Sequence, residues 1–272
     1  SGLITAIIAG LVMSLLSGGY YQISGPTGAM AAILMSLVAA YGMDGVFIAT
    51  LIAGIILLLA GILHLGKLTS FIPAPVITGF TSGIAVIIAL GQIDNFFGTF
   101  SEGSSAVAKL FSYARLGFSP NFTAVGLGVF VILFMVFFPK KWNAVVPASL
   151  LSIILTTAFS IFMELDVTVV GEIPQTLIPE NRLLFSALDI KTITALITPA
   201  FSIAILGMIE SLLCGASAGR MTGVRLDSNQ ELIAQGVGNI LLPFFGGIPA
   251  TAAIARTSVA VKSGAKTSLT GV

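Results

Sequence analysis

The sequence predicts an all-α membrane protein that crosses the bilayer several times. Hydrophobic residues make up 56% of its 272 residues and charged residues only 8%, whereas a soluble domain carries about 25% charged residues. The mean hydropathy is +1.08. The formal net charge of +1 gives no field that would attract nucleic acid, and the single cysteine, Cys214, excludes an internal disulfide framework. We therefore expect a multi-pass protein of the cell membrane, and its short loops favour a bacterial inner membrane.

Seven apolar stretches approach the length of about 20 residues that a helix needs to cross the hydrocarbon core. Two shorter apolar stretches each follow a sequence that contains glycine and proline. A mildly amphipathic stretch at residues 104–116 is expected to lie at a membrane interface. The long stretches are residues 3–19, 44–66, 75–93, 121–139, 143–163, 191–214 and 228–244, and the short ones are residues 26–41 and 249–263.

The basic residues predict the orientation. If Ser1 lies outside and every stretch changes side, eight basic residues fall on one side and four on the other. The positive-inside rule makes the richer side cytoplasmic. The eight are Lys67, Lys140, Lys141, Arg220, Arg225, Arg256, Lys262 and Lys266, and the four are Lys109, Arg115, Arg182 and Lys191.

Two similar sequences precede the short apolar stretches, "YYQISGPTGAM" at residues 20–30 and "FFGGIPATAAI" at residues 244–254. Irregular backbone at membrane depth is tolerated only where it packs within protein or lines a cavity. Proline suits the first turn of a helix, because its missing N–H would have no partner there. We therefore predict that Pro26 and Pro249 each begin a half-helix after a short extended strand.

The predicted orientation makes the two half-helices run in opposite directions, and broken helices at matching positions of inverted repeats indicate a transporter's binding site. Their N-termini would face each other, each with unpaired N–H groups and a partial positive charge that attracts anions. Ordinary glycine and proline kinks are the alternative, with Thr27 and Thr251 as plain N-caps. The residues expected around the anion are Pro26, Thr27, Gly28 and Ala29 at the first start and Ala250, Thr251 and Ala252 at the second.

Five motifs together resemble the SulP family of anion permeases, the sulfate permease family: "ISGPTGAM", "FIPAPVITGFTSGIAV", "IESLL", "SNQELIAQGVGNI" and "FGGIPATAAIARTSVAVKSGAKT". They occur in the family's order and cover nearly the whole chain. The resemblance implies fourteen membrane segments in two inverted repeats of seven, commonly followed by a cytoplasmic STAS domain, and often a homodimer. It predicts that residues 1–272 are a partial transport domain, about segments two to ten, which lacks the first segment, the last four and any STAS domain.

Glu210 is an acid in the middle of a predicted span. A carboxylate in hydrocarbon is costly, so such residues usually face a cavity and mark an ion path; a helix-packing network is the alternative. The resemblance places Glu210 and Cys214 where the family binds its coupling cation. By the same resemblance, bicarbonate-transporting relatives that use sodium have Asp at the position of Glu210 and hydroxyl residues at the positions of Cys214 and Ile254. Because a thiol and an aliphatic chain offer no hard oxygen ligand, a proton is favoured over sodium.

Arg256 lies within the second short stretch. It could add positive charge to the anion site, pair with Glu210, or extend its charged end to the cytoplasmic interface. In exchanger-like members of the resembled family, a basic residue at this place is linked with anion binding. We therefore count Arg256 among the expected substrate-binding residues.

The sequence and the resemblance together predict a secondary active transporter or exchanger of small anions, of the sulfate, bicarbonate, chloride or dicarboxylate class, coupled to protons. The alternatives are a sodium-coupled bicarbonate symporter, a nucleobase-type permease, and a channel-like or non-transporting anion-binding protein. We expect no enzyme and no cofactor, because Cys214 has no nearby histidine and the sequence contains no P-loop and no carboxylate pair suited to acid–base catalysis.

Overall fold

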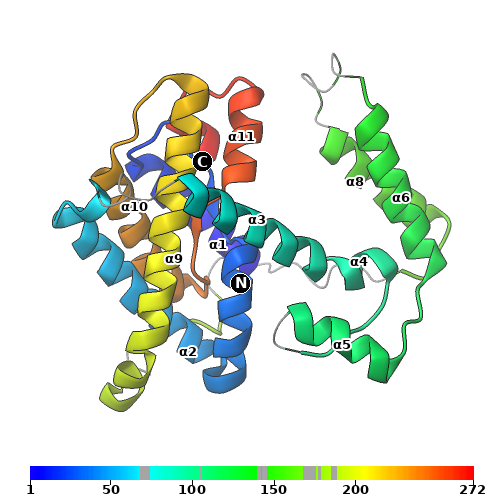
Figure 1. Ribbon diagram of the computed structural model, residues 1–272, viewed down its shortest axis with the longest axis horizontal. Coiled ribbons are helices and arrows are strands. Elements are labelled where there is room, and N and C mark those ends of the chain that lie inside the picture. The colour runs from blue at the N-terminus through cyan, green and yellow to red at the C-terminus, as the bar shows by residue number, and fades with distance from the viewer. Residues whose placement is uncertain are drawn as a thin grey trace. The chain divides into compact units, whose positions relative to one another are not determined.

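The computed structural model describes residues 1–67, 74–103, 106–139, 142, 146, 148–167, 176, 179–184 and 189–272, and its elements are mainly helices (Figure 1). Lys140, Lys141 and the first residues of the predicted span 143–163 lie outside the described residues. The elements are α1 (Gly2–Leu16), β1 (Ser24–Gly25), α2 (Gly28–Ile62), α3 (Ala74–Gly91), α4 (Ile93–Phe97), α5 (Ala106–Leu116), α6 (Phe122–Phe137), α8 (Ala148–Phe162), α9 (Ile190–Thr222), α10 (Ser228–Leu241), β2 (Thr251–Ala252) and α11 (Ile254–Lys262), with 3-10 helices η3 (Leu242–Phe245) and η4 (Ser268–Gly271).

The chain divides into two compact units. The first unit combines residues 1–84 with residues 174–272, and the second comprises residues 85–173. The first unit therefore contains both sequences that predict half-helices, with α1, α2, α9, α10 and α11. The second unit contains α4, α5, α6 and α8.

Helices α2 and α10 approach each other closely in the first unit because glycines remove side chains from their contact. A Cβ atom on Gly236 would lie 2.4 Å from the backbone nitrogen of Leu58, and one on Gly54 would lie 2.6 Å from that of Ile240. Such small residues let membrane helices pack backbone against backbone. Around this contact lies a core of fully buried apolar side chains that includes Phe47, Leu57, Leu196, Ile203, Leu212 and Leu232.

Helix α2 is broken at Gly42. This residue has φ 67° and ψ −169°, a conformation that is open essentially only to glycine. The break separates residues 28–41 from residues 43–62. It confirms that the short stretch 26–41 and the long stretch 44–66 are distinct segments, as the sequence predicts.

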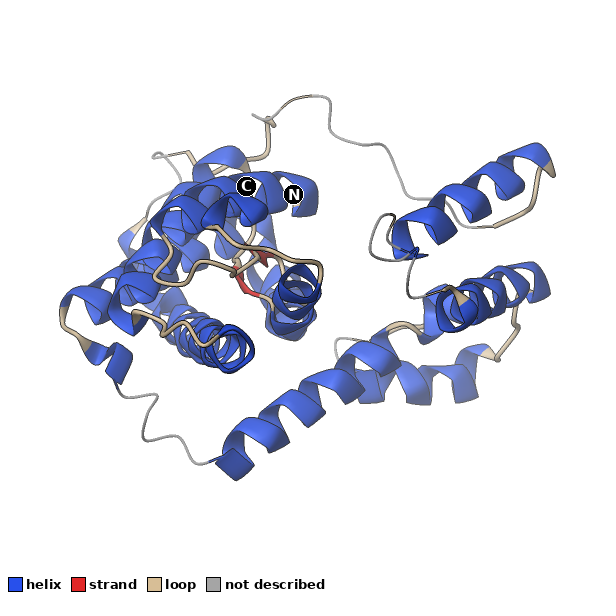
Figure 2. Ribbon diagram, turned by 90° about the horizontal axis from the view of Figure 1, so that it is seen from above, coloured by secondary structure: helices blue, strands red, loops and turns tan. Residues whose placement is uncertain are grey.

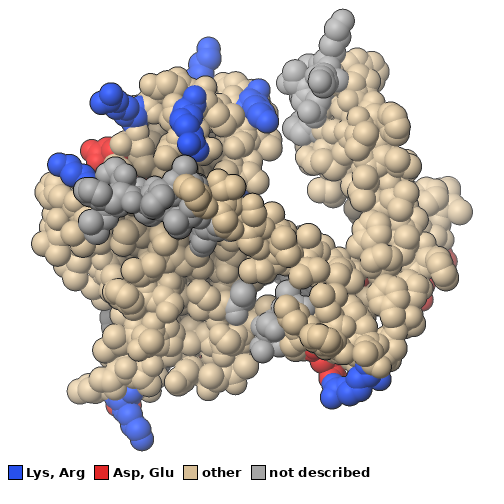
Figure 3. Space-filling model, in the orientation of Figure 1, with Lys and Arg blue, Asp and Glu red and all other residues tan. Residues whose placement is uncertain are grey.

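The outer surfaces of both units suit hydrocarbon. Large apolar side chains face outward, and Phe122 and Phe162 are 83% and 86% exposed. By length and composition, residues 33–62, which include the break at Gly42, and residues 190–222 could cross a membrane, and α1, α6 and α8 are shorter apolar helices. In the first unit, most Lys and Arg side chains gather at the end where α9 and α11 finish (Figure 3). Arg220 lies in the last turn of α9 and Lys262 in the last turn of α11.

The second unit has its own polar cluster around Asp94 in α4. The carboxylate accepts hydrogen bonds from Ser101 (2.5 Å) and from the Tyr113 hydroxyl (2.7 Å), and Lys109 Nζ lies 3.9 Å away. Burial opposes the ionisation of Asp94, but these hydrogen bonds and the lysine charge outweigh it and hold the pKa of Asp94 below its ordinary value. This carboxylate is therefore fixed in its charged form.

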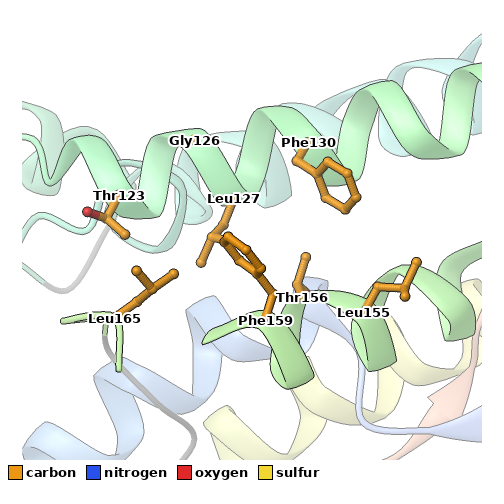
Figure 4. A pocket seen from close by; sticks show the side chains of 8 residues that line it. All are labelled: Thr123, Gly126, Leu127, Phe130, Leu155, Thr156, Phe159 and Leu165. Carbon is orange, nitrogen blue, oxygen red and sulfur yellow. The ribbon is translucent and has the colours of Figure 1, made fainter. Parts of the chain in front are cut away.

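An apolar cavity of about 480 Å³ lies between α6 and α8 of the second unit. Figure 4 shows Leu127 and Phe130 of α6 pointing toward Phe159 of α8 across it. Among the described residues that line it, the polar side chains are those of Thr123 and Thr156. A lining of this kind offers an anion little compensation for lost hydration, so this cavity does not suit the anion site that the sequence predicts.

Candidate functional site

Two short strands lie side by side among the helices of the first unit (Figure 2). β1 pairs antiparallel with β2, with Ser24 opposite Ala252 and Gly25 opposite Thr251. This pairing confirms the prediction that each half-helix follows a short extended strand. The strands belong to sequences more than two hundred residues apart, so the pairing brings the two predicted helix starts together.

At the first start, α2 begins at Gly28, two residues after Pro26. The N-cap residue Thr27 is extended, with φ −119° and ψ 151°, but its side chain makes no capping hydrogen bond. Among the described residues, no side chain is found that caps the first-turn N–H groups of α2. Gly28 is exposed while Ala29 is buried, so the helix start is open at Gly28.

The second start differs from the prediction, because α11 begins at Ile254 and not at Pro249. Residues 250–252 stay extended because partners distant in sequence bind their backbone. The N–H of Ala250 donates to Oδ1 of Asn239 (2.9 Å), and that of Ala252 donates to Oγ of Ser211 (3.2 Å). Within the part of the chain that the structure describes, no side chain caps α11 either. The uncapped N–H groups of this start consequently belong to residues 254–256.

Glu210 of α9 joins the two starts. Its Oε2 accepts a hydrogen bond from Oγ1 of Thr251 (2.6 Å) and another from Oγ1 of Thr27 (3.0 Å). Thr251 is fully buried and Glu210 is 6% exposed. No cationic side chain of the described residues lies within ion-pairing distance of this carboxyl group, since the pairs found there are Lys109–Asp94 and Arg115–Glu102.

Arg256 reaches from the second start to the first. Its Nη2 donates to the carbonyl oxygen of Pro26 (2.9 Å). A Cβ atom on Gly25 would lie 2.9 Å from its Nη1, so the glycine makes room for the guanidinium group. The side chain is half-buried. Of the three roles that the sequence left open, the structure excludes a direct pair with Glu210 and places the positive charge beside the first start.

Cys214 lies one turn beyond Glu210 and has different partners. Its thiol donates to Oγ1 of Thr257 (3.2 Å), which also accepts the N–H of Ile23 (3.0 Å). Cys214 is fully buried, and none of its hydrogen bonds reaches Glu210. Its side chain supports the chain before β1 through Thr257.

Sequence reasoning missed the polar face of α10. Asn239 binds both backbone groups of Ala250, and Gln235 Nε2 donates to Oγ of Ser24 in β1 (2.9 Å). Glu231 is fully buried and accepts hydrogen bonds from Ser17, Gly18 and Gln235. The signal was present in "SNQELIAQGVGNI", where three polar residues recur every four positions in a predicted span.

Comparison with known protein sequences identifies the family. The family model described as the sulfate permease family matches residues 1–272. YvdB of Bacillus subtilis, provisionally named a sulfate transporter, is 39% identical over 100% of this chain and 52% of its own length. The bicarbonate transporter BicA of Picosynechococcus sp. is 31% identical over 100% of this chain and 50% of its own. The chain thus spans about half the length of these curated relatives.

Solved structures agree with this assignment. The transmembrane domain of a cyanobacterial bicarbonate transporter BicA matches with a TM-score of 0.86 at 31% identity, over 100% of this chain and 71% of that one. Murine Slc26a9, an anion transporter solved in the inward-facing state, matches with a TM-score of 0.75 at 17% identity, over 99% of this chain and 53% of that one, and supports the fold alone. The inverted-repeat transporter fold predicted from the sequence is confirmed. Over its whole length, this chain belongs to the sulfate permease family.

Proposed function

We propose that the full-length protein is a secondary active transporter or exchanger of small anions, which binds its substrate between the starts of α2 and α11. The observation that carries this proposal is that β1 and β2 hold the starts of α2 and α11 together, while Thr27 at the first start and Thr251 in β2 donate to one buried carboxyl group. A helix N-terminus attracts anions through its free N–H groups and its dipole. Two such starts around one point both attract an anion.

The binding groups divide into three kinds. Backbone N–H groups come from the first turns of α2 and α11, hydroxyl groups from Thr27 and Thr251, and a positive charge from Arg256 beside Pro26. In this arrangement Ala250 and Ala252 hold the extended segment that orients the second start, because Asn239 and Ser211 already accept their N–H groups.

Competition for the threonine hydroxyls can couple the anion to a proton. Each hydroxyl has one hydrogen to donate, and both hydroxyls point at Oε2 of Glu210. An ionised Glu210 holds both donors and repels an anion. A protonated Glu210 binds the hydroxyls less strongly and carries no charge, so the donors can turn to the anion. Since linkage is reciprocal, a bound anion favours the proton on Glu210 in turn.

The test is the substitution Glu210→Gln in the full-length protein reconstituted in proteoliposomes. Glutamine keeps the size and an acceptor oxygen but cannot release a proton. We expect sulfate or bicarbonate uptake driven by a pH gradient to disappear, while binding of the same anion remains measurable. Gradient-driven uptake equal to that of the wild type would overturn the coupling role of Glu210.

Sodium is a second candidate coupling ion. Three oxygens, Oε2 of Glu210 and the hydroxyls of Thr27 and Thr251, lie within 3.4 Å of one another along their hydrogen bonds, and hard oxygen ligands suit sodium. Against it, Cys214 binds Thr257 and adds no oxygen. Sodium and pH gradients imposed separately on the same vesicles distinguish the two ions.

The relatives bear on which anion is carried. YvdB is provisionally named a sulfate transporter, and BicA is named a bicarbonate transporter. We propose an anion of one of these two classes, with chloride and dicarboxylates as the wider range. We further propose that residues 1–272 correspond to about segments two to ten of the transport domain, and that the full-length protein forms a homodimer in a bacterial inner membrane. Uptake of uracil that anions do not compete with would instead favour a nucleobase permease.

A further inference from the structure

We infer that Gln235 and Asn239 of α10 are positioning residues of the anion site, an inference that rests on the proposed function. Each residue holds one of the two chain segments that lead to a helix start. Gln235 binds β1 through Ser24, and Asn239 binds the residue before β2 through both backbone groups of Ala250. Together they set the distance between the starts of α2 and α11.

Helix α10 is suited to act as the fixed frame. Its backbone packs against that of α2 at Gly236 and Gly54, where no side chain fits between them. Gln235 and Asn239 lie four residues apart and so on the same helical face. Both side chains are almost completely buried, with exposed fractions of 0% and 2%. Because α10 is fixed in this way, a substitution of Gln235 or Asn239 should shift the chain segment that the side chain binds, β1 or the residue before β2.

Asn239 acts as an additional strand edge. Its Nδ2 donates to the carbonyl oxygen of Ala250 and its Oδ1 accepts the N–H of the same residue, both at 2.9 Å. This is the pattern of a backbone pair in an antiparallel ladder. The contact fixes the approach to β2 in position and in rotation, and β2 carries Thr251 toward Glu210.

The hydrogen bond from Gln235 to β1 comes with a destabilising feature, a buried oxygen atom without a hydrogen-bond partner in the part of the chain that the structure describes. Its Nε2 donates to Oγ of Ser24 (2.9 Å) and to Oε1 of Glu231 (2.8 Å), while its own Oε1 is buried without a partner among the described residues. A buried polar atom without a partner destabilises a fold. An apolar side chain of the same size would avoid that cost but would lose the hydrogen bonds to Ser24 and to the buried Glu231, and these two bonds explain a glutamine here.

Glu231 keeps the amide of Gln235 in this orientation. Its Oε1 accepts from Gln235, and its Oε2 accepts from the hydroxyl of Ser17 (2.6 Å) and the N–H of Gly18 (3.2 Å) at the end of α1. The face of α10 thus connects α1, β1 and the approach to β2. A disturbance at Gln235 is expected to reach the first start, and one at Asn239 the second.

The experiment compares two readouts in the purified full-length protein. The melting temperature without anion reports the general stability of the fold. The concentration of sulfate, and separately of bicarbonate, that gives half of the anion-induced rise in melting temperature reports the geometry of the site. The variants are Gln235→Met, Ser24→Ala, their combination, and Asn239→Leu. Thr50→Val is the matched control, because Thr50 is fully buried and its hydroxyl bonds only to Val46 within α2.

We expect Gln235→Met, Ser24→Ala and Asn239→Leu each to raise the half-maximal anion concentration about tenfold. The Gln235→Met and Ser24→Ala combination should raise it no further than Gln235→Met alone, because the contact that Ser24→Ala removes is already lost in Gln235→Met. The Thr50→Val control should lower the melting temperature without moving the half-maximal concentration. Half-maximal concentrations like that of the wild type in all α10 variants would overturn the positioning role alone. A wild-type protein that neither anion stabilises would overturn the proposed anion site as well.

Discussion

The two helix starts share a design but differ in where the extended chain ends. At the first start, α2 follows β1 almost at once, and Thr27 is its N-cap. At the second, the chain stays extended through β2, and α11 begins at Ile254. Thr27 therefore lies at the edge of its helix and is partly exposed, whereas Thr251 lies in a strand and is fully buried.

This difference separates two tasks. The first start, with exposed Gly28 and a neighbouring guanidinium group, is the more open to an anion. The second start is fixed by Asn239 and Ser211 and brings the shorter hydrogen bond to Glu210. We therefore expect the first start to govern anion affinity and the second to govern coupling.

Among substitutions that compare the two starts, the largest effect should come from Thr251→Val. It removes a fully buried hydrogen bond of 2.6 Å to the Glu210 carboxyl, and such bonds to a charged group contribute about 1.5–3 kcal/mol. Uptake driven by a pH gradient should fall roughly tenfold to hundredfold. Thr27→Val, which removes the bond of 3.0 Å, is the matched control and should reduce coupling only a few-fold. Equal losses in the two variants, measured in proteoliposomes, would contradict the division of tasks.

An intermediate effect is expected at Arg256. Arg256→Met removes the positive charge beside Pro26 and should raise the half-saturating anion concentration about tenfold. Gly25→Ala should act in the same direction without changing any charge, because its Cβ would displace the guanidinium group and alanine would strain the backbone at φ 159°. Saturation curves of initial uptake measure both. If the half-saturating anion concentration rises for Arg256→Met but not for Gly25→Ala, the position of the guanidinium group beside Gly25 does not affect anion binding.

The smallest effect is expected at Asp94, which lies outside both starts. Its pKa is held below the ordinary value, so its interactions stabilise the second unit above about pH 4 and are lost as the pH falls through the lower, folded-state pKa. Asp94→Asn should lower the melting temperature slightly at neutral pH and remove that pH dependence. Anion uptake should not change. A clear change in coupling would show that a carboxylate paired with Lys109 also takes part in transport.

Much of this architecture could be predicted because it depends on local chemistry. Apolar length located the spans, and proline and glycine located the strands and the first helix start. The start of α11 could not be predicted, because Asn239 and Ser211 decide it from other helices. The role of Arg256 depends in the same way on Pro26, which is far away in the sequence. The polar face of α10 was predictable from its spacing, but only its contacts with Ser24 and Ala250 show which segments it holds.

The shortness of α11 has an electrical consequence. Its nine residues span about 14 Å at ~1.5 Å per residue, which is about half of a hydrocarbon core ~30 Å thick. An anion bound at its start would therefore lie near the middle of the membrane's electric field. Moving one charge across a full 100 mV involves about 2.3 kcal/mol, so each half of the passage would carry roughly half of that energy. Membrane voltage would then act on both the loading and the release of the anion.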